Sequence, residues 1–542
     1  MGRASRRQRR EATIEGYGQS HLFNAGSVNL ESGNGGTAEP VVKHSMKVKD
    51  LFFGTEIAAI SGSGEPEINS VAYDSRKVNA GALFFALRGE KEDGNKYVRE
   101  ALKRGAVAIA SEAPPEGAVP LEISLALIQP GAQRRVLASV SANFFRNPAK
   151  ELQLVGVTGT NGKTTTTHLI DSILRASGMR TGLIGTIGSR TPRGKREAIN
   201  TTPESLDLQQ MFAEVRDEGG KAVVMEASSH ALAMDRLWGC HFGAAVFTNL
   251  TRDHLDYHKT FEEYFAAKRR LFEGTGAGPA EVGVVNSDDA YGKLLEGVAR
   301  RTLTYGLKNG AQIKAEKFPL SFSGLEFTAQ TPQGKIEVQS RLVGKINVYN
   351  ILAAIGAGMA LGVSGSAIER GVRELESVPG RFERIAAGQP FLVIVDYAHT
   401  DDALRNLIST ARELCGDKRI ITLFGAGGDR DRTKRPLMGE AAGTLSDFVV
   451  LTSDNPRSED PLRIINDVMV GLQKTNAKYK VEADRGKAIE IAVNEARPGD
   501  IVLLAGKGHE TYQVLREGPI EFDDREVARR ILSAYGYGAK KN

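Results

Sequence analysis

Cysteine and long apolar runs are both scarce in this chain, and each shortage excludes a class of protein. Two of the 542 residues are cysteine, Cys240 and Cys415, which excludes a disulfide scaffold and a zinc site built from cysteines. The longest apolar run, 351–363, is too short and too rich in glycine and alanine to cross a bilayer. We therefore expect a protein of the cytoplasm that does not act in a membrane.

An excess of one charge is lacking as well. The net charge is +5, and arginines crowded into the first ten residues supply part of it. A net positive charge of this size is too small to indicate a nucleic-acid partner. No apolar segment follows these arginines, so we expect no secretory signal. Residues 1–45 are polar and rich in glycine, serine and asparagine, which predicts a disordered extension.

Length and patterning predict several domains of the α/β class. A domain holds about 150 residues, and a hydrophobic share of 41% is typical of a globular protein. We predict an N-terminal domain at 46–132, a central domain at 133–379 and a C-terminal domain at 380–542. In the last of these, strand patterns at 391–395, 419–424, 448–452 and 501–505 alternate with helical patterns at 402–414, 461–473 and 486–496. This alternation predicts a mostly parallel sheet, with ligands beyond the carboxyl ends of its strands.

A glycine-rich turn between an apolar strand and a helical pattern carries the strongest chemical signal. Gly159 and Gly162 let backbone N–H groups face a phosphate at the N-terminus of the helix. Lys163 is expected to reach the β- and γ-phosphates of a nucleotide, and the Thr164 hydroxyl to hold Mg²⁺. The strict P-loop spacing fails by one place, because Val157 stands where its first glycine belongs.

Two further strands end in side chains that could hold a metal ion. An apolar strand at 222–225 delivers Glu226, and a second strand at 244–247 runs into the segment that carries His254. We expect both side chains at neighbouring strand ends, on the same edge as the glycine-rich turn. Oxygen and imidazole ligands suit magnesium or manganese. Alternatively, each histidine is a hydrogen-bonded structural residue.

Six motifs in one order resemble those of the Mur ligases, ATP-dependent amide-forming enzymes of peptidoglycan precursor synthesis. The motifs lie at 158–164, 226–230, 249–256, 347–350, 380–383 and 396–400. The resemblance covers nearly everything from Met46 onward. It implies a three-domain α/β architecture, with a central P-loop ATPase-like parallel sheet and a C-terminal Rossmann-like domain.

Within that family, the chain is similar to members that use ATP to add meso-diaminopimelate to UDP-N-acetylmuramoyl-L-alanyl-D-glutamate (UDP-MurNAc-L-Ala-D-Glu). The resemblance implies that the UDP-linked substrate contacts Tyr73, Ser75, Glu90, Lys91, Glu92, Asn200, Thr201, Thr202, Ser228 and Arg236. Met234 departs from the pattern, since many relatives have glutamine there. The segment 201–203 could instead be a plain helix start, because proline is favoured at the first helical position.

The nucleotide and the acceptor amino acid receive their own sets of residues from the same resemblance. The set implied for ATP is Gly159, Thr160, Asn161, Gly162, Lys163, Thr164, Thr165, Asn347, Asn350, Arg381, Asp396 and His399. The set implied for diaminopimelate is Arg430, Asp454, Asn455, Pro456, Arg457, Gly506 and Glu510. Lysine-adding relatives lack the arginine at 457, whose planar fork suits a carboxylate. The alternative for Arg457 is a solvated loop arginine.

Lys268 looks, on its residues alone, like a solvated helix lysine, and Lys268→Ala is then expected to be close to neutral for stability. The resemblance implies instead that CO₂ carbamylates it to N6-carboxylysine. It further implies two Mg²⁺ ions, held by Thr164, Glu226, His254 and the Lys268 carbamate. Lys163, Glu226, His254 and Lys268 form the expected catalytic set.

Two other functions compete with this interpretation. Folylpolyglutamate synthetase shares this kind of P-loop, but it lacks the first domain, which is marked here by Asp74-Ser75-Arg76 and by 81–86. A P-loop NTPase that moves a partner would hydrolyse ATP without any amine acceptor. We expect a monomer that acts on small molecules.

Overall fold

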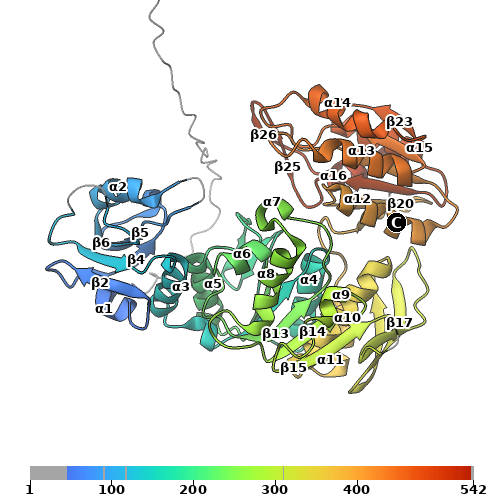
Figure 1. The fold of residues 1–542 in the computed structure, drawn as a ribbon. Coiled ribbons are helices and arrows are strands. Elements are labelled where there is room, and N and C mark those ends of the chain that lie inside the picture. Colours follow the sequence, from blue (N-terminus) through green and yellow to red (C-terminus); the bar gives the residue numbers. More distant parts are fainter. Residues whose placement is uncertain (1–44, 90–91, 116–118, 309, 539–542) are drawn as a thin grey trace, which may run out of the picture. The chain divides into compact units, whose positions relative to one another are not determined.

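The computed structural model describes residues 45–89, 92–115, 119–308 and 310–538. The extension predicted at 1–45 lies outside these residues except for Ser45, and so do Glu90 and Lys91. Three large β-sheets follow one another along the described chain (Figure 1). Within the described ranges, no helix has the length and apolar character that crossing a membrane requires.

The first sheet has five strands in the order β2-β7-β6-β5-β4, and β4 to β7 run parallel. The elements of this region are β1 (Met46–Lys47), α1 (Val48–Leu51), β2 (Ile57–Ser61), β3 (Glu67–Ile68), β4 (Ser70–Ala72), η1 (Ser75–Lys77), β5 (Ala82–Phe85), η2 (Gly94–Tyr97), α2 (Val98–Lys103), β6 (Ala106–Ser111) and β7 (Ser124–Ile128). Helix α3 (Gln133–Phe144), which the predicted boundary assigns to the central domain, packs Val136, Leu137 and Phe144 into the core of this sheet. The core of the first sheet therefore extends past the predicted boundary.

The second sheet has eleven strands in the order β11-β10-β9-β12-β8-β13-β14-β15-β16-β17-β18. Its strands are β8 (Gln153–Thr158), β9 (Thr181–Gly185), β10 (Gly188–Thr191), β11 (Gly194–Arg196), β12 (Ala222–Glu226), β13 (Phe242–Phe247), β14 (Val282–Asn286), β15 (Arg301–Gly306), β16 (Ile313–Glu316), β17 (Leu325–Thr331) and β18 (Gly334–Ser340). The strands from β9 to β16 in this order are parallel, and the pairs at both ends are antiparallel.

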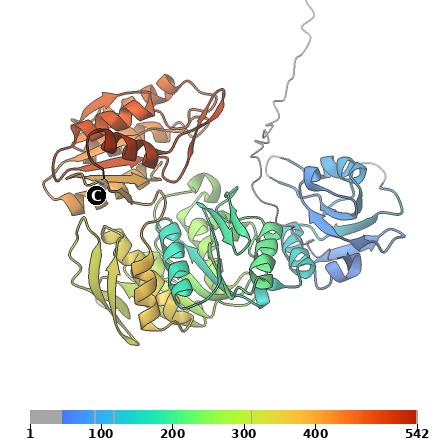
Figure 2. The same ribbon diagram turned by 180° about the vertical axis from the view of Figure 1, so that it is seen from behind.

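Helices cover both faces of the second sheet because its inner strands are apolar on both sides. The helices of this region are η3 (Pro148–Lys150), α4 (Lys163–Ala176), α5 (Ser205–Asp217), α6 (Ser229–Ala233), α7 (Leu255–His258), α8 (Phe261–Glu273), α9 (Ala290–Lys293), α10 (Lys345–Ala360) and α11 (Gly365–Glu374). Val155 and Val157 of β8 share a core with α4, α10 and α11, whereas Leu154 shares one with α5 and α8. Figure 2 shows the sheet from the side opposite to that of Figure 1.

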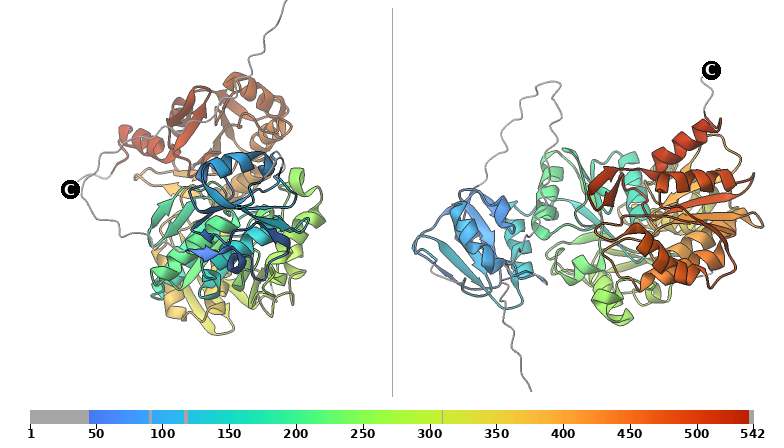
Figure 3. Two further views of the ribbon diagram at one scale, coloured as in Figure 1. Left: turned by 90° about the vertical axis from the view of Figure 1, so that its left-hand side faces the viewer. Right: turned by 90° about the horizontal axis from the view of Figure 1, so that it is seen from above.

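The third sheet has six strands in the order β19-β20-β24-β21-β22-β23, all parallel except β19. Its elements are β19 (Glu383–Ile385), β20 (Leu392–Asp396), α12 (Asp401–Cys415), β21 (Ile420–Phe424), α13 (Lys434–Leu445), β22 (Phe448–Leu451), α14 (Pro461–Leu472), β23 (Lys478–Val481), α15 (Arg485–Glu495), β24 (Ile501–Ala505) and α16 (Asp524–Ala534), with a hairpin of β25 (Tyr512–Leu515) and β26 (Gly518–Glu521). Helices α12 to α14 cover one face and α15 and α16 the other (Figure 3). The predicted alternation is confirmed.

Candidate active site

The glycine-rich turn has the predicted strand–loop–helix form, from β8 into α4. Gly159 and Gly162 have φ angles of +141° and +86°. A Cβ on Gly159 would lie 1.9 Å from Thr248 Oγ1, and one on Gly162 would lie 2.5 Å from Asn350 Oδ1. Glycine is therefore required at both positions, by backbone conformation and by space.

Lys163 lies inside this loop. Its Nζ donates to the carbonyl oxygens of Gly159 (3.1 Å) and Thr160 (2.8 Å). Burial lowers the pKa of Lys163, while Glu226 and Asp253 oppose that shift. The amine thus occupies the concave side of a loop whose N–H groups and helix N-terminus attract anions.

Glu226 ends β12, and His254 follows β13 by way of the loop after Phe247. The two strands are not neighbours as expected, because β8 lies between them. Both still reach the edge at which the P-loop begins. Glu226 accepts hydrogen bonds from Thr186, through the backbone N–H at 2.8 Å and the hydroxyl at 3.1 Å. Thr186 follows β9, a strand without any motif, so nothing in the sequence singled it out.

His254 has a left-handed backbone, with φ +53°, and its Nε2 lies 3.4 Å from Asp253 Oδ2. Burial lowers its pKa to about 4, and the neighbouring Asp253 opposes this shift. The imidazole is therefore neutral near pH 7, which is the form that ligates metals. Asp253 lies within the motif at 249–256, but no role was predicted for it.

Lys268 is not a solvated lysine. Its side chain is 1% exposed, and its Nζ donates to Gly159 O at 2.8 Å. It lies one helical turn after the buried Tyr264 on α8, 4.3 Å from that ring, and so points with the apolar stripe into the protein. Burial and the nearby Lys163 hold the pKa of Lys268 well below its usual value. The expectation of a solvated Lys268 was wrong, and with it the reason for expecting a near-neutral Lys268→Ala.

One cavity of about 690 Å³ connects these groups. Of the residues predicted for ATP, the metal or catalysis, it is lined by Thr160, Asn161, Gly162, Lys163, Thr164, Thr165, Glu226, His254, Lys268, Asn347, Asn350, Arg381, Asp396 and His399. It also includes Thr251, Asp253 and Asp402, which the sequence did not assign. Two of these lining residues are bonded to each other, since Thr251 Oγ1 donates to Asp402 Oδ2 at 3.0 Å.

The side chains that could ligate a metal ion suit a metal bound to a nucleotide better than a metal held by protein ligands alone. Among the described residues, no three His, Cys, Asp or Glu side chains cluster as a ready-made metal site. Glu226 and His254 could supply two ligands, and the Thr164 hydroxyl a third. Mg²⁺ is commonly held by a few protein oxygens together with phosphates and waters. The residues present therefore fit magnesium that arrives with a nucleotide.

The residues predicted for the UDP-linked substrate form two separate groups. Thr202 Oγ1 donates to Glu226 O at 2.7 Å, Ser228 N donates back to that hydroxyl at 3.0 Å, and Arg236 Nη1 donates to Thr202 O at 2.8 Å. Asn200 is exposed and Thr201 half-buried beside them. Pro203 precedes α5 by two positions, so the alternative of a proline at the first helical position was wrong. The sulfur of Met234 lies 3.7 Å from Arg236 Nη2.

The second group belongs to the region of the first sheet, although Tyr73 also lies close enough to Arg236 of the first group to feel its charge. Tyr73 donates to Asp207 Oδ2 at 2.6 Å and Ser75 to Glu100 Oε2 at 3.0 Å. Glu92 accepts from the hydroxyl of Tyr97 at 3.4 Å. Their role toward a uridine nucleotide stays a prediction.

The residues predicted for diaminopimelate do come together, at the carboxyl ends of β21, β22 and β24. Asn455 donates to Glu510 Oε2 at 2.9 Å, and the buried Lys507, which the sequence missed, donates to the same oxygen at 3.1 Å. Asp454 Oδ2 is buried without a hydrogen-bond partner among the described residues, and it approaches the position of a Cβ on Gly506.

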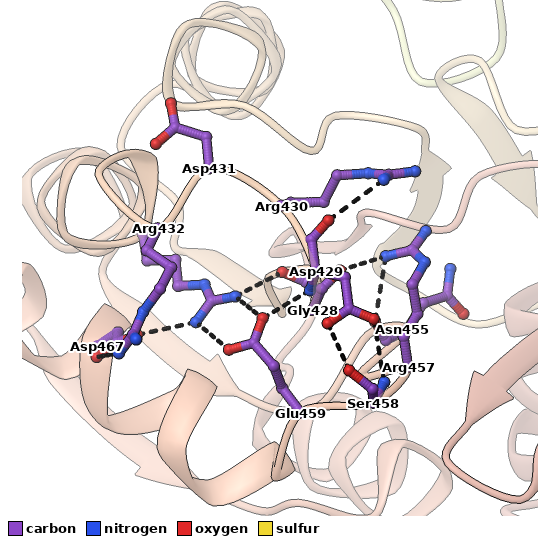
Figure 4. Close-up of polar contacts among 12 residues, drawn as sticks. Gly428, Asp429, Arg430, Asp431, Arg432, Asn455, Arg457, Ser458, Glu459 and Asp467 are labelled. Carbon is purple, nitrogen blue, oxygen red and sulfur yellow. Dashed lines mark hydrogen bonds and ion pairs between the residues drawn. The ribbon is translucent and has the colours of Figure 1, made fainter. Parts of the chain in front are cut away.

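Arg430 and Arg457 reach this region from two loops, which Figure 4 shows. Arg457 Nη1 donates to Gly428 O at 2.8 Å, and its backbone is left-handed, with φ +54°. Arg430 Nη1 donates to Asp429 O at 3.3 Å. Arg457 is thus anchored to the protein on one side of its guanidinium, unlike a freely solvated loop arginine.

Comparisons with known proteins agree on one family. Family models match residues 157–358 (Mur ligase middle domain), 380–508 (Mur ligase, glutamate ligase domain) and 67–150 (Mur ligase family, catalytic domain). A UDP-N-acetylmuramoyl-L-alanyl-D-glutamate–2,6-diaminopimelate ligase of Solibacter usitatus is 54% identical, over 87% of this chain and 95% of that protein. A protein of the same name from Geobacillus thermodenitrificans is 45% identical, over 90% and 99%. A solved structure with that name is 34% identical, with a TM-score of 0.64, and covers 91% of this chain and 100% of its own.

Proposed function

The chain belongs to the Mur ligase family, and from this premise we propose that it adds meso-2,6-diaminopimelate to UDP-MurNAc-L-Ala-D-Glu. The reaction forms an amide bond, converts ATP to ADP and phosphate, and yields a peptidoglycan precursor. The observation that carries the assignment is the single cavity in which the P-loop, Glu226, His254 and Lys268 converge. Cytoplasmic location and a monomeric state stay predictions from the sequence.

Amide formation from a carboxylate and an amine in water is uphill, so the carboxylate must first gain a good leaving group. A carboxylate oxygen of the D-glutamate attacks the γ-phosphorus of ATP, and ADP leaves. The amine of diaminopimelate then attacks the carbonyl carbon of the acyl phosphate, loses a proton, and expels phosphate. Catalysis of such a transfer depends on positioning and on charge stabilisation, because no protein nucleophile is needed.

The P-loop would hold the phosphates of ATP. Its N–H groups and the N-terminus of α4 favour anions. Lys163 now donates to two carbonyl oxygens of its own loop, and a phosphate oxygen is a stronger acceptor than either. In our proposal Lys163 exchanges those bonds for the β- and γ-phosphates, which places a positive charge where negative charge develops.

Magnesium ions, two in our proposal, would neutralise charge on the transferring phosphoryl group. Thr164, Glu226 and His254 would hold them. Thr186 fixes the Glu226 carboxylate with two hydrogen bonds, so this ligand is oriented in advance.

Lys268 would complete the site as an N6-carboxylysine. Only a neutral amine can add to CO₂, and burial beside Lys163 favours the neutral form of Lys268. The product carries a negative charge, which relieves the repulsion between the two lysines.

The proposal is tested by measuring phosphate release while ATP, UDP-MurNAc-L-Ala-D-Glu and meso-diaminopimelate are omitted in turn. We expect release only when all three are present, and we expect EDTA to stop it and Mg²⁺ to restore it. Exchange of diaminopimelate for L-lysine should lower the rate strongly. ATP hydrolysis that ignores the acceptor would favour an NTPase instead.

A further inference from the structure

A nearly fully buried arginine lies behind the two loops that carry Arg430 and Arg457. Arg435, in the first turn of α13, is 1% exposed. Its Nη1 donates to Glu459 Oε2 at 3.0 Å and to Asp467 Oδ2 at 2.8 Å. Its Nη2 donates to Glu459 Oε1 at 2.7 Å and to Gly427 O at 3.1 Å. One guanidinium thus binds the loop after β21, the loop after β22, and helix α14.

The same two loops are joined directly to each other. Gly428 N donates to Asn455 O at 2.9 Å, and Asp429 N donates to Glu459 Oε1 at 2.6 Å. The hydroxyl of Ser458 donates to Asp429 Oδ1 at 2.7 Å (Figure 4). Glu459 therefore links Arg435 to the backbone of the first loop, and hydrogen bonds tie the two loops to each other.

This linkage sets the distance between the two candidate carboxylate-binding arginines. A Cβ placed on Gly427 would lie 3.2 Å from Arg457 Nη1 and 3.7 Å from Arg430 Cγ, so both side chains flank that glycine. Gly427 is also the residue whose carbonyl Arg435 holds. A shift of the loop at Gly427 would change how the two guanidinium groups face a ligand.

Charge gives a second reason for the arrangement. Glu459 follows Arg457 by two positions, and Asp429 precedes Arg430 directly. Arg435 holds both oxygens of Glu459, which lowers the pKa of that carboxyl to about 2. A carboxylate released from Arg435 would attract the arginines of its own loops and compete with a ligand for them.

We propose that Arg435, through Glu459, is a positioning residue for acceptor selectivity: it holds the loops so that Arg430 and Arg457 receive the far carboxylate of the acceptor amino acid. The inference rests on the proposed function and deepens it. Arg435 itself is buried behind the loops and acts only through them. An ammonium group lacks the fork that binds three partners at once, so lysine cannot replace it.

The test compares Arg435→Lys and Glu459→Gln with wild type, with kcat and KM measured for each substrate and with L-lysine as the alternative acceptor. We expect the KM for diaminopimelate to rise about 10-fold or more in both variants. The KM values for ATP and for the UDP-linked substrate, and the use of L-lysine, should stay within about two-fold of wild type because they do not involve this carboxylate. Selectivity for diaminopimelate over L-lysine therefore falls.

Arg419→Lys is the matched control. Arg419 binds the carboxylate of Asp500 and the carbonyl of Glu495, which is chemistry similar to that of Arg435. It lies in the same domain but directly precedes β21, at the edge of the sheet opposite to the two loops. The Arg419→Lys variant should leave the KM values for diaminopimelate, ATP and the UDP-linked substrate unchanged. An unchanged KM for diaminopimelate in Glu459→Gln, or equal losses for every substrate, would overturn the inference. A wild-type protein that uses neither acceptor would instead overturn the proposed function, and the inference with it.

Discussion

Replacement of Arg457 by alanine is the sharpest test of how the acceptor is recognised. In the structure, Nη1 of Arg457 is engaged by Gly428 O at 2.8 Å and by Asn455 O at 3.4 Å. Its Nε and Nη2 have no hydrogen-bond partner among the described residues. The guanidinium is therefore anchored through one nitrogen and can present the other two to a ligand carboxylate in a bidentate geometry.

The expected losses differ between folding and binding. For folding, Arg457→Ala removes the bond to Gly428 O, worth about 1 kcal/mol at a half-buried site. For binding, it removes a charge-assisted interaction with the acceptor carboxylate, worth roughly 1.5–3 kcal/mol, so kcat/KM for diaminopimelate should fall about 10- to 150-fold. The KM for the UDP-linked substrate should stay unchanged.

The assay is phosphate release at saturating ATP and UDP-MurNAc-L-Ala-D-Glu, with diaminopimelate varied. Arg432→Ala is the control, because Arg432 lies in the same loop region but its side chain is 66% exposed and its guanidinium pairs with Asp467 rather than reaching the acceptor side of the loop. It should behave like wild type. If Arg457→Ala keeps kcat/KM within about three-fold of wild type, or if wild type uses L-lysine as well as diaminopimelate, the assignment of Arg457 is wrong.

Two further predictions concern buried groups. Lys268→Ala should abolish ligation and also lower the free energy of unfolding by about 1–3 kcal/mol, because the cavity left by the side chain and the lost hydrogen bond to Gly159 O outweigh the relief of burying one amine. Urea denaturation checks this against Arg269→Ala on the same helix, and equal stability of the two variants would contradict it. His509 has its pKa lowered from 6.5 to about 4 by burial and by Arg381 and Arg525. Between these values the unfolded chain binds more protons than the folded one, so stability should fall as the pH falls from about 6.5 to about 4, and His509→Asn should reduce that slope; an unchanged slope would place the imidazole in solvent.

Local sequence was enough for the elements whose signal is local. The strand at 501–505 is confirmed at Ile501–Ala505, because an apolar run between turn residues can satisfy its backbone only inside a sheet. The P-loop was found from its glycines, whose φ angles no other residue adopts easily. Strand β23 was missed because all four of its side chains are exposed and carry no apolar run.

The sequence was not enough to predict the spatial arrangement of the site. The sequence named Glu226 and His254, but placed them on neighbouring strands, since strand order is set by crossover connections and not by distance along the chain. Thr186 holds Glu226 from forty residues away in sequence and carries no motif.

The sequence by itself determined the α/β class, the glycine-rich loop, the resemblance to a family and the identity of most candidate site residues, because these depend on patterns within a few residues. Only the tertiary structure decided the state of those residues. From the sequence alone, Lys268 and Arg435 would be taken for cations on the surface. In the structure both residues are 1% exposed. Their burial depends on Gly159, 109 positions from Lys268, and on Glu459, 24 positions from Arg435. Whether such a cation is solvated, neutral or paired is set by partners that only folding brings near it.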